Sequence, residues 1–238
     1  MKFARTNQRY TQKREALSAQ YGPQELWSVA DHWPLYCSLD NLGRFMAIAD
    51  LFRSTLSIPG HVAEFGSWRG TSLVFLTKLL RLYDPHGSKV VHCFESFEGL
   101  TSLTPQDGDR SRLEGRYQSA REALEDIIAL HELQDDICIH QGLIEDTLPN
   151  VLSTNPSLSF SFVFCDVDLY APTRTLLDHM HPRLVPGGVI VFDEWNHEEF
   201  PGEGIAVNEF LQTWSHAYRL EHILHARRPT LAIRKQHG

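Results

Sequence analysis

Short apolar segments alternate along this chain with longer segments in which apolar residues recur at helical spacing. The expected strands include residues 61–65, 89–94, 137–140, 159–165 and 189–192, and the expected helices include residues 40–56, 71–83, 114–133 and 172–184. Near-continuous apolar strands joined by helices are typical of parallel strands covered on both faces. We therefore expect an α/β fold with a doubly wound sheet.

The length and composition favour one domain with a short extension. With 238 residues, of which 42% are hydrophobic, the chain can bury a full core without disulfides or a structural metal. We expect a domain over residues 38–238 and a helical extension over residues 1–37 that covers an edge or contacts another subunit. The polar segment 96–113 contains glycine and proline after a strand, which is typical of a lid or binding loop. Arg110, Arg112 and Arg116, in or beside this segment, either clamp a phosphate group or remain solvated.

The charge balance excludes several classes of partner. The chain carries 22 Lys and Arg against 30 Asp and Glu, a net charge of −8, and has no dense basic run. Nucleic acid is therefore not an expected partner, because phosphate contacts supply most of that affinity. No apolar run is long enough to cross a bilayer, so we expect a protein that does not insert into a membrane.

The four cysteines lack the spacing of a metal site, and we expect free thiols. Free thiols are typical of a reducing compartment, so we expect a cytoplasmic protein.

A glycine-containing turn links the strand at 61–65 to the helix at 71–83, and it carries Glu64, Gly66 and Gly70. The glycines permit a tight turn and let a ligand approach the backbone beside the free N–H groups of the helix. A dinucleotide-binding turn would have a glycine in place of Glu64, whose carboxylate would repel a pyrophosphate. The carboxylate would attract an ammonium or sulfonium group. The turn therefore favours S-adenosylmethionine over a nicotinamide cofactor, unless it is an ordinary loop.

Further cofactor contacts are expected at the ends of the next strands. Glu95 ends the second strand, where an acid can bind ribose hydroxyls or can simply be solvated. Gly142 follows the third strand and would let an adenine ring pack against the backbone. The candidate cofactor contacts are Glu64, Gly66, Ser67, Thr71, Glu95, Ser96, Gly142 and Asp166.

Carboxylates follow the next two strands of the alternation. Asp166 and Asp168 come after the strand at 159–165, and Asp193 and Glu194 come after the strand at 189–192. If these strands are neighbours, the carboxylates converge and repel one another unless they share a cation. Ligand sets made only of oxygen suit Mg²⁺, Mn²⁺ or Ca²⁺. Alternatively, the acids cap the helices that follow, a role that suits Asp168 best.

Several motifs together resemble those of a known family. They are EFGSWRG at 64–70, ESFEGL at 95–100, Gly142 with DTLP at 146–149, DVDLYAPT at 166–173, PGG at 186–188 and the Asp193-Glu194 pair. In this order they resemble the macrocin O-methyltransferase family, which methylates sugar hydroxyls of natural products, over roughly residues 40–215. The resemblance implies a Rossmann-like class I methyltransferase fold, with seven strands of which the last is antiparallel. It also implies S-adenosylmethionine, a divalent cation (usually Mg²⁺) and a homo-oligomer.

The resemblance assigns roles to three acids. It places the metal on Asp166, Asp193 and Glu194, and it makes Asp166 the group that takes the proton of the acceptor. Two residues depart from the usual pattern. The family often has two aspartates where this chain has Asp193-Glu194, and it often has aspartate where this chain has Glu95. Both differences lengthen a side chain that is expected to hold a ligand.

The expected function is transfer of a methyl group to a sugar hydroxyl of a glycosylated natural product, a sugar nucleotide or a glycan. In-line displacement at the sulfonium methyl is mainly a task of positioning. A cation and a carboxylate would help to deprotonate a weakly nucleophilic hydroxyl. The alternatives are a metal-dependent methyltransferase of catechol-like molecules, a nicotinamide-dependent oxidoreductase, which Glu64 disfavours, and a non-catalytic protein that binds S-adenosylmethionine.

Overall fold

A computed structural model of the chain describes residues 26–109 and 111–236, together with residues 5, 8, 12, 15 and 19. Within these residues the strands form one seven-stranded sheet in the order β3-β2-β1-β4-β5-β7-β6. The strands are β1 (His61–Phe65), β2 (Val91–Glu95), β3 (Ile137–Gln141), β4 (Phe160–Cys165), β5 (Leu184–Phe192), β6 (Tyr218–His222) and β7 (Leu231–Lys235). Strands β1 to β5 pair in parallel, and β7 is antiparallel to both β5 and β6. The predicted fold class is confirmed.

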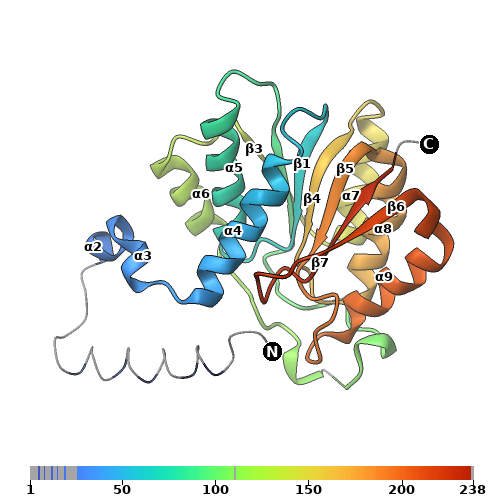
Figure 1. The fold of residues 1–238 in the computed structure, drawn as a ribbon. Coiled ribbons are helices and arrows are strands. Elements are labelled where there is room, and N and C mark those ends of the chain that lie inside the picture. The colour runs from blue at the N-terminus through green and yellow to red at the C-terminus, as the bar shows by residue number, and fades with distance from the viewer. Residues whose placement is uncertain are drawn as a thin grey trace.

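Helices cover both faces of the sheet (Figure 1). They are α2 (Leu26–Asp31), α3 (Trp33–Tyr36), α4 (Leu39–Arg53), α5 (Thr71–Tyr83), α6 (Arg121–Leu130), α7 (Ile144–Thr154), α8 (Tyr170–Arg183) and α9 (Pro201–Trp214), with 3-10 turns η1 (Pro105–Asp107), η2 (Ser111–Leu113) and η3 (Ser215–Ala217). One apolar cluster joins the sheet to α4, α5 and α6, and a second joins it to α7, α8 and α9. The sheet is therefore the middle layer of three.

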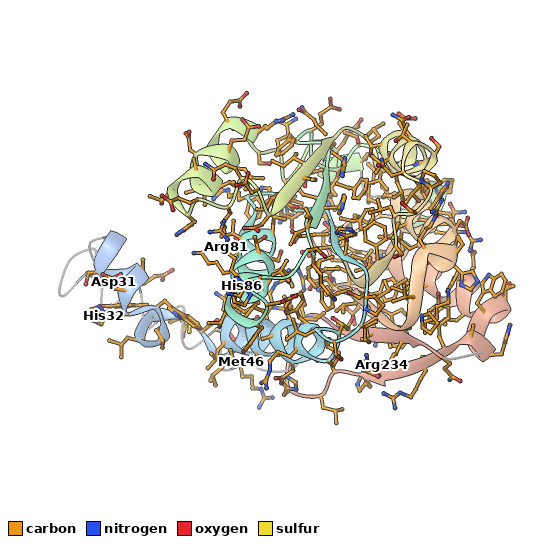
Figure 2. All side chains as sticks on the ribbon, turned by 90° about the horizontal axis from the view of Figure 1, so that it is seen from above. Asp31, His32, Met46, Arg81, His86 and Arg234 are labelled. Atoms are coloured by element: carbon orange, nitrogen blue, oxygen red, sulfur yellow. The ribbon has the colours of Figure 1, made fainter. Side chains whose placement is uncertain are left out.

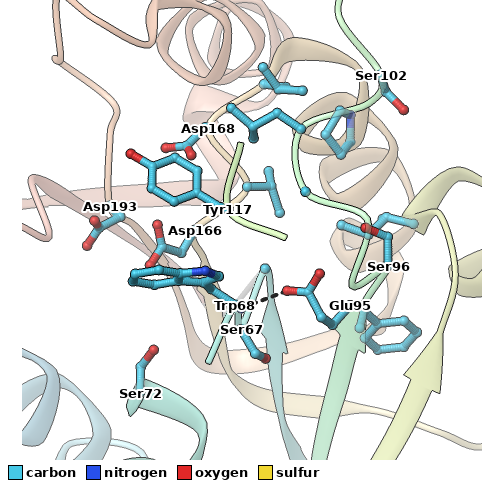
Figure 3. A pocket seen from close by; sticks show the side chains of 18 of the residues that line it. Ser67, Trp68, Ser72, Glu95, Ser96, Ser102, Tyr117, Asp166, Asp168 and Asp193 are labelled. Atoms are coloured by element: carbon cyan, nitrogen blue, oxygen red, sulfur yellow. Dashed lines mark hydrogen bonds between the residues drawn. The ribbon is translucent and has the colours of Figure 1, made fainter. Parts of the chain in front are cut away.

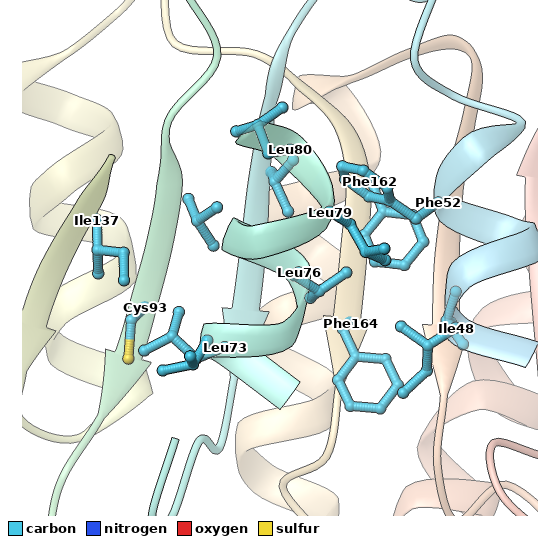
Figure 4. Packing of buried hydrophobic residues seen from close by; sticks show 14 of the residues in the cluster. Ile48, Phe52, Leu73, Leu76, Leu79, Leu80, Cys93, Ile137, Phe162 and Phe164 are labelled. Atoms are coloured by element: carbon cyan, nitrogen blue, oxygen red, sulfur yellow. The ribbon is translucent and has the colours of Figure 1, made fainter. Parts of the chain in front are cut away.

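The strands are apolar along their length because both of their faces are buried. In β4, Phe162 and Phe164 face the cluster with α4 and α5, whereas Val163 and Cys165 face the opposite cluster. Figure 4 shows Phe162 and Phe164 packed beside Phe52 of α4 and the leucines of α5. Each such side chain contributes about 1.5–3 kcal/mol when it is fully buried. These layers fix α4 and α5 against the strands whose ends carry the predicted site.

The strand order reverses between β1 and β4, and a crevice at such a reversal is where open α/β sheets bind ligands. The two strands come very close at their carboxyl ends. Gly66, which follows β1, has φ +81°, and a side-chain carbon there would lie 2.1 Å from the carbonyl oxygen of Asp166. Glycine is therefore required at this position both by its left-handed backbone and by the lack of space.

Two helix predictions differ from the structure. The helix expected over 114–133 is shorter, because α6 begins at Arg121 and the preceding residues form turns. Helix α7 was not predicted, and it contains Pro149, which interrupts the helical pattern of the sequence. Its buried face, formed by Ile144, Leu148 and Leu152, nevertheless has helical spacing.

The start of the described chain lies apart from the layers. Figure 2 shows Asp31 and His32, at the junction of α2 and α3, at the periphery of the molecule. In α3 and its surroundings, Trp33 and Leu35 are exposed. Most of the residues in the predicted extension 1–37 fall outside the described residues, and so does Arg110. None of the helices in the described part of the chain combines the length and apolar composition needed to cross a bilayer.

Candidate active site

A cavity of about 510 Å³ opens at the carboxyl ends of the central strands, within the size range of small-molecule sites. Of the predicted cofactor contacts, all but one line it: Gly66, Ser67, Thr71, Glu95, Ser96, Gly142 and Asp166. The exception is Glu64. Asp168 and Asp193 line the same cavity (Figure 3). The structure thus brings residues that lie about 100 positions apart in the sequence to one cavity.

Glu95 organises the two loops on either side of it. One carboxylate oxygen accepts a hydrogen bond from the backbone N–H of Trp68 at 2.7 Å, drawn in Figure 3, and the other accepts from the N–H of Phe97 at 2.9 Å. Both Trp68 (φ 47°) and Phe97 (φ 65°) have left-handed backbone, which is costly for residues with side chains. Glu95 therefore holds two strained turns in place at the rim of the cavity. Contact between Glu95 and a ribose stays a prediction.

Glu64 lies behind the cavity wall. Its side chain is fully buried, and one oxygen accepts a hydrogen bond from Ser67 Oγ at 3.2 Å, while Oε1 has no partner among the described residues. Burial raises the pKa of this carboxyl to about 8, although the nearby hydroxyls of Ser72 and Ser67 act to lower it. At neutral pH the group is mostly uncharged. Glu64 could therefore attract a cofactor cation, as predicted, only through Ser67 or after the carboxyl loses its proton.

Asp166 and Asp193 lie side by side at the ends of β4 and β5, as the sequence predicts, and both line the cavity. An arginine of α4 connects them. The guanidinium of Arg44 donates to Asp166 Oδ2 at 2.7 Å and to Asp193 Oδ1. Burial and the charge of Asp193 raise the pKa of Asp166 to about 6, although Arg44 opposes this rise. Asp166 and Asp193 thus share the guanidinium of Arg44 as a counter-ion.

Glu194 does not line the cavity. Its carboxyl contacts the guanidinium of Arg228 and lies 3.4 Å from the ring of His197. Burial and then the charge of Asp193 raise the pKa of Glu194 to about 9. Its backbone N–H donates to the buried carboxyl of Glu203 at 2.7 Å. Glu194 therefore belongs to a buried polar group behind the cavity.

The cation implied by the family resemblance does not fit this arrangement. Among the described residues, no three His, Cys, Asp or Glu side chains are placed so that they could hold a metal ion. Arg44 takes one oxygen of Asp166 and one of Asp193, and Glu194 is directed to Arg228. Arg44 thus takes one oxygen of each of the two carboxylates, and its positive charge beside them disfavours a second cation.

Asp168 has an unusual conformation at the cavity wall. It has φ 64°, is 9% exposed and forms no hydrogen bond in the described part of the chain. The alternative interpretation of Asp168 as a helix cap does not hold, because the cap of α8 is Leu169 and the N–H of Tyr170 donates to Asp107 at 2.8 Å. Strained residues without structural partners concentrate at functional sites. Asp168 is therefore free to bind a ligand hydroxyl.

The segment predicted as a lid is packed against the domain. Asp107 is buried and also accepts hydrogen bonds from the backbone and side chain of Thr104, each at 2.7 Å. Leu100 and Leu113 join Leu169 and Phe200 in a small apolar cluster. The segment contributes Gly99 to Ser102 to the cavity lining. It forms one wall of the site.

Of the arginines predicted to clamp a phosphate, the two that the structure describes, Arg112 and Arg116, do not line the cavity. Arg116 pairs with Glu199 at 3.5 Å, both exposed, and Arg112 is exposed as well. The basic groups that do line the cavity are Arg44 and Arg228. The sequence analysis did not single them out, because a basic residue on an amphipathic helix or in a loop has the pattern of a solvated one. Only the tertiary structure brings Arg44 and Arg228 close to the carboxylates that follow β4 and β5.

The model of the Macrocin-O-methyltransferase (TylF) family matches residues 7–223. The chain belongs to the macrocin O-methyltransferase family. The match covers most of the sequence and includes each of the strands that carry site residues.

Two relatives of this chain are O-methyltransferases by name, and one of the names specifies a rhamnosyl group. Mycinamicin III 3''-O-methyltransferase of Micromonospora griseorubida is 29% identical over 147 residues, 58% of this chain and 56% of that protein. A 4'-O-methyltransferase of a rhamnosyl tetracenomycin from Streptomyces olivaceus is 31% identical over 149 residues, 58% of this chain and 54% of that protein. The matched stretch thus spans a little over half the length of these relatives.

Solved structures agree over a larger part of the chain. The structure of CalS11, a calicheamicin methyltransferase, superposes with a TM-score of 0.80 at 25% identity, and the match covers 98% of this chain and 92% of that one. An O-methyltransferase of Bacillus cereus in complex with SAH matches with a TM-score of 0.56 at 14% identity, covering 93% and 96% of the two chains. The second likeness shows the fold alone, and both agree with a class I methyltransferase sheet.

Proposed function

We propose that this protein is an S-adenosylmethionine-dependent O-methyltransferase that methylates a sugar hydroxyl of a natural product or of a nucleotide-linked sugar. The observation that carries the proposal is the shared cavity. The glycine turn after β1, Glu95, Asp166 and Asp168 all line it. The names of the relatives, which include a TDP-rhamnose 3'-O-methyltransferase, support a sugar acceptor.

The cofactor would occupy the end of the cavity beside β1 and β2. Gly66, Ser67 and Thr71 line it there, at the N-terminus of α5, where free backbone N–H groups can bind the carboxylate of the methionine part. Ser96 and Gly142 line the neighbouring wall, beyond Glu95, where the nucleoside would lie. This arrangement would direct the sulfonium methyl toward the acids of β4.

The acceptor would lie against Asp166 and Asp168. Asp166 keeps one carboxylate oxygen outside its bond to Arg44 and would accept the proton of the attacking hydroxyl. Asp168, which has no hydrogen bond of its own, would accept a hydrogen bond from a neighbouring hydroxyl of the sugar. Two adjacent contacts fix the direction of the attacking oxygen, and in-line displacement requires that direction.

The sequence also predicts a homo-oligomer and a cytoplasmic protein, and both remain part of the proposal. Trp33 and Leu35 are 39% and 76% exposed, and they lie beside α2 at the periphery, where another subunit could cover them. Light scattering coupled to size exclusion would test this. A mass that corresponds to one chain would contradict it.

The proposed activity is tested by acceptor screening. Purified protein is incubated with S-adenosylmethionine and TDP-rhamnose, a glycosylated macrolide or a catechol, and S-adenosylhomocysteine release is measured. We expect release only with the sugar-containing acceptors. Release with catechol alone would favour the phenol methyltransferase, whereas thermal stabilisation by NADH and not by S-adenosylhomocysteine would favour an oxidoreductase.

A further inference from the structure

Arg44 occupies the space between the two carboxylates that the family resemblance assigns to a metal. Nη2 donates to Asp166 Oδ2 at 2.7 Å, and Nη1 donates to Asp193 Oδ1. Asp193 is 1% exposed in this pair, and the side chain of Arg44 is 22% exposed. The planar guanidinium suits this role, because its parallel N–H groups can bridge two carboxylates.

The helix that carries Arg44 is anchored on several sides. The hydroxyl of Ser38 caps the start of α4 by accepting from the N–H of Asn41 at 3.2 Å. At Gly43, a side-chain carbon would lie 3.0 Å from the carbonyl oxygen of His225, so the helix packs closely against that loop. Arg44 also lies over the ring of Phe164, at 5.4 Å from its centroid. Its position is therefore set by the core and not by the acids alone.

Arg228 places a second positive charge beside the carboxylates that follow β5. It pairs with Glu194 and lies 4.0 Å from Asp193 Oδ2. Each carboxylate predicted as a metal ligand is thus within ion-pair distance of a guanidinium. A Mg²⁺ ion needs oxygens at about 2.0–2.1 Å in near-octahedral geometry. Bound to the remaining oxygens of Asp166 and Asp193, such an ion would lie beside the positive charge of Arg44, which repels it.

We propose that Arg44 is the built-in counter-ion of the Asp166–Asp193 pair and excludes a divalent cation from it. The positive charge that relatives could obtain from a metal is here supplied by the chain itself. The inference concerns cation binding by the protein without cofactor or acceptor. It is therefore independent of the function proposed above.

Binding of Mn²⁺ tests this directly, because free and bound Mn²⁺ are distinguished by electron paramagnetic resonance. Wild-type protein, Arg44→Met and a control, Arg53→Met, are titrated with Mn²⁺. Arg53 lies on the same helix but is exposed and stacks on Tyr83. We expect Arg44→Met to bind one Mn²⁺ at least tenfold more tightly than the wild type, and Arg53→Met to match the wild type.

The site of binding is checked by a second substitution. In the Arg44→Met background, Asp193→Asn should return Mn²⁺ affinity to the wild-type level, because it removes a ligand. Equal affinity of the wild type and Arg44→Met would overturn the proposal. If Arg44→Met does not fold, Arg44→Gln, which keeps a hydrogen bond to one carboxylate, replaces it. The wild type alone is also decisive: a stoichiometric Mn²⁺ site of micromolar affinity that Asp193→Asn abolishes would refute the exclusion.

Discussion

Replacing Glu64 with glutamine should make the protein gain stability relative to the wild type as the pH rises. The Glu64 carboxyl is fully buried, and burial raises its pKa to about 8 from an ordinary value of 4.5. Between these values the folded protein keeps a proton that the unfolded chain releases. The free energy of unfolding of the wild type therefore falls as the pH rises through this window. Glutamine does not titrate and lacks this dependence.

The size of the effect follows from the two pKa values. Each pKa unit corresponds to about 1.36 kcal/mol, so the gap between 4.5 and about 8 is worth roughly 5 kcal/mol once the pH exceeds 8 and roughly 3 kcal/mol at pH 7. The buried Oε1 of Glu64 has no hydrogen-bond partner among the described residues. The amide of the variant would be unsatisfied there, at a cost of about 1–3 kcal/mol that is the same at every pH.

Urea denaturation of both proteins at several pH values between about 5 and 8 measures the difference in unfolding free energy. We expect the difference to move in favour of Glu64→Gln throughout this range. Glu221→Gln provides a control whose stability difference from the wild type should stay flat over this pH range. Glu221 is partly buried, but Arg234 and Arg219 hold its pKa below the usual range, so its contribution to stability is already complete above about pH 5. A flat difference for Glu64→Gln would refute the assignment of a neutral buried carboxyl.

Three further substitutions test the site. Gly66→Ala should destabilise the protein by more than about 2 kcal/mol and abolish the binding of S-adenosylhomocysteine, measured by calorimetry. The control Gly115→Ala should retain binding, because Gly115 has a similar φ but its nearest contact would be at 3.5 Å. Asp166→Asn should lower kcat by about 10²–10⁴ with unchanged cofactor affinity, and an active variant would remove it as the base. Asp107→Ala should cost about 2–4 kcal/mol in urea unfolding because it removes three hydrogen bonds, and exposed Asp109→Ala should cost far less.

Local features of the sequence predict the strands and the glycine turn well. Strand β1 has the predicted bounds, because a run of apolar residues between a Pro-Gly turn and a glycine leaves few other choices. The meeting of Asp166 and Asp193 is predictable too, since the carboxyl ends of neighbouring parallel strands share one edge. The helix α7 escapes prediction because Pro149 lies inside it.

Contacts between distant segments decide the remaining features of the site. Arg44 reaches acids that lie 122 and 149 positions away, and nothing in its own segment indicates this. Glu194 follows Asp193 directly, and successive residues that leave a strand point in different directions. One of the pair therefore faces the cavity and the other faces Arg228. The tertiary structure, and not the motif, determines which carboxylates can act together.

The central claim is that the cavity transfers a methyl group from S-adenosylmethionine to a sugar hydroxyl. Mass spectrometry of reactions that contain S-adenosylmethionine with a labelled methyl group and TDP-rhamnose or a glycosylated macrolide tests it most directly. The account predicts that the wild type places the labelled methyl group on the sugar oxygen and that Asp166→Asn, which still binds S-adenosylhomocysteine, does not. Failure of the wild type to bind S-adenosylhomocysteine, or transfer of the label only to a non-sugar acceptor, would contradict it.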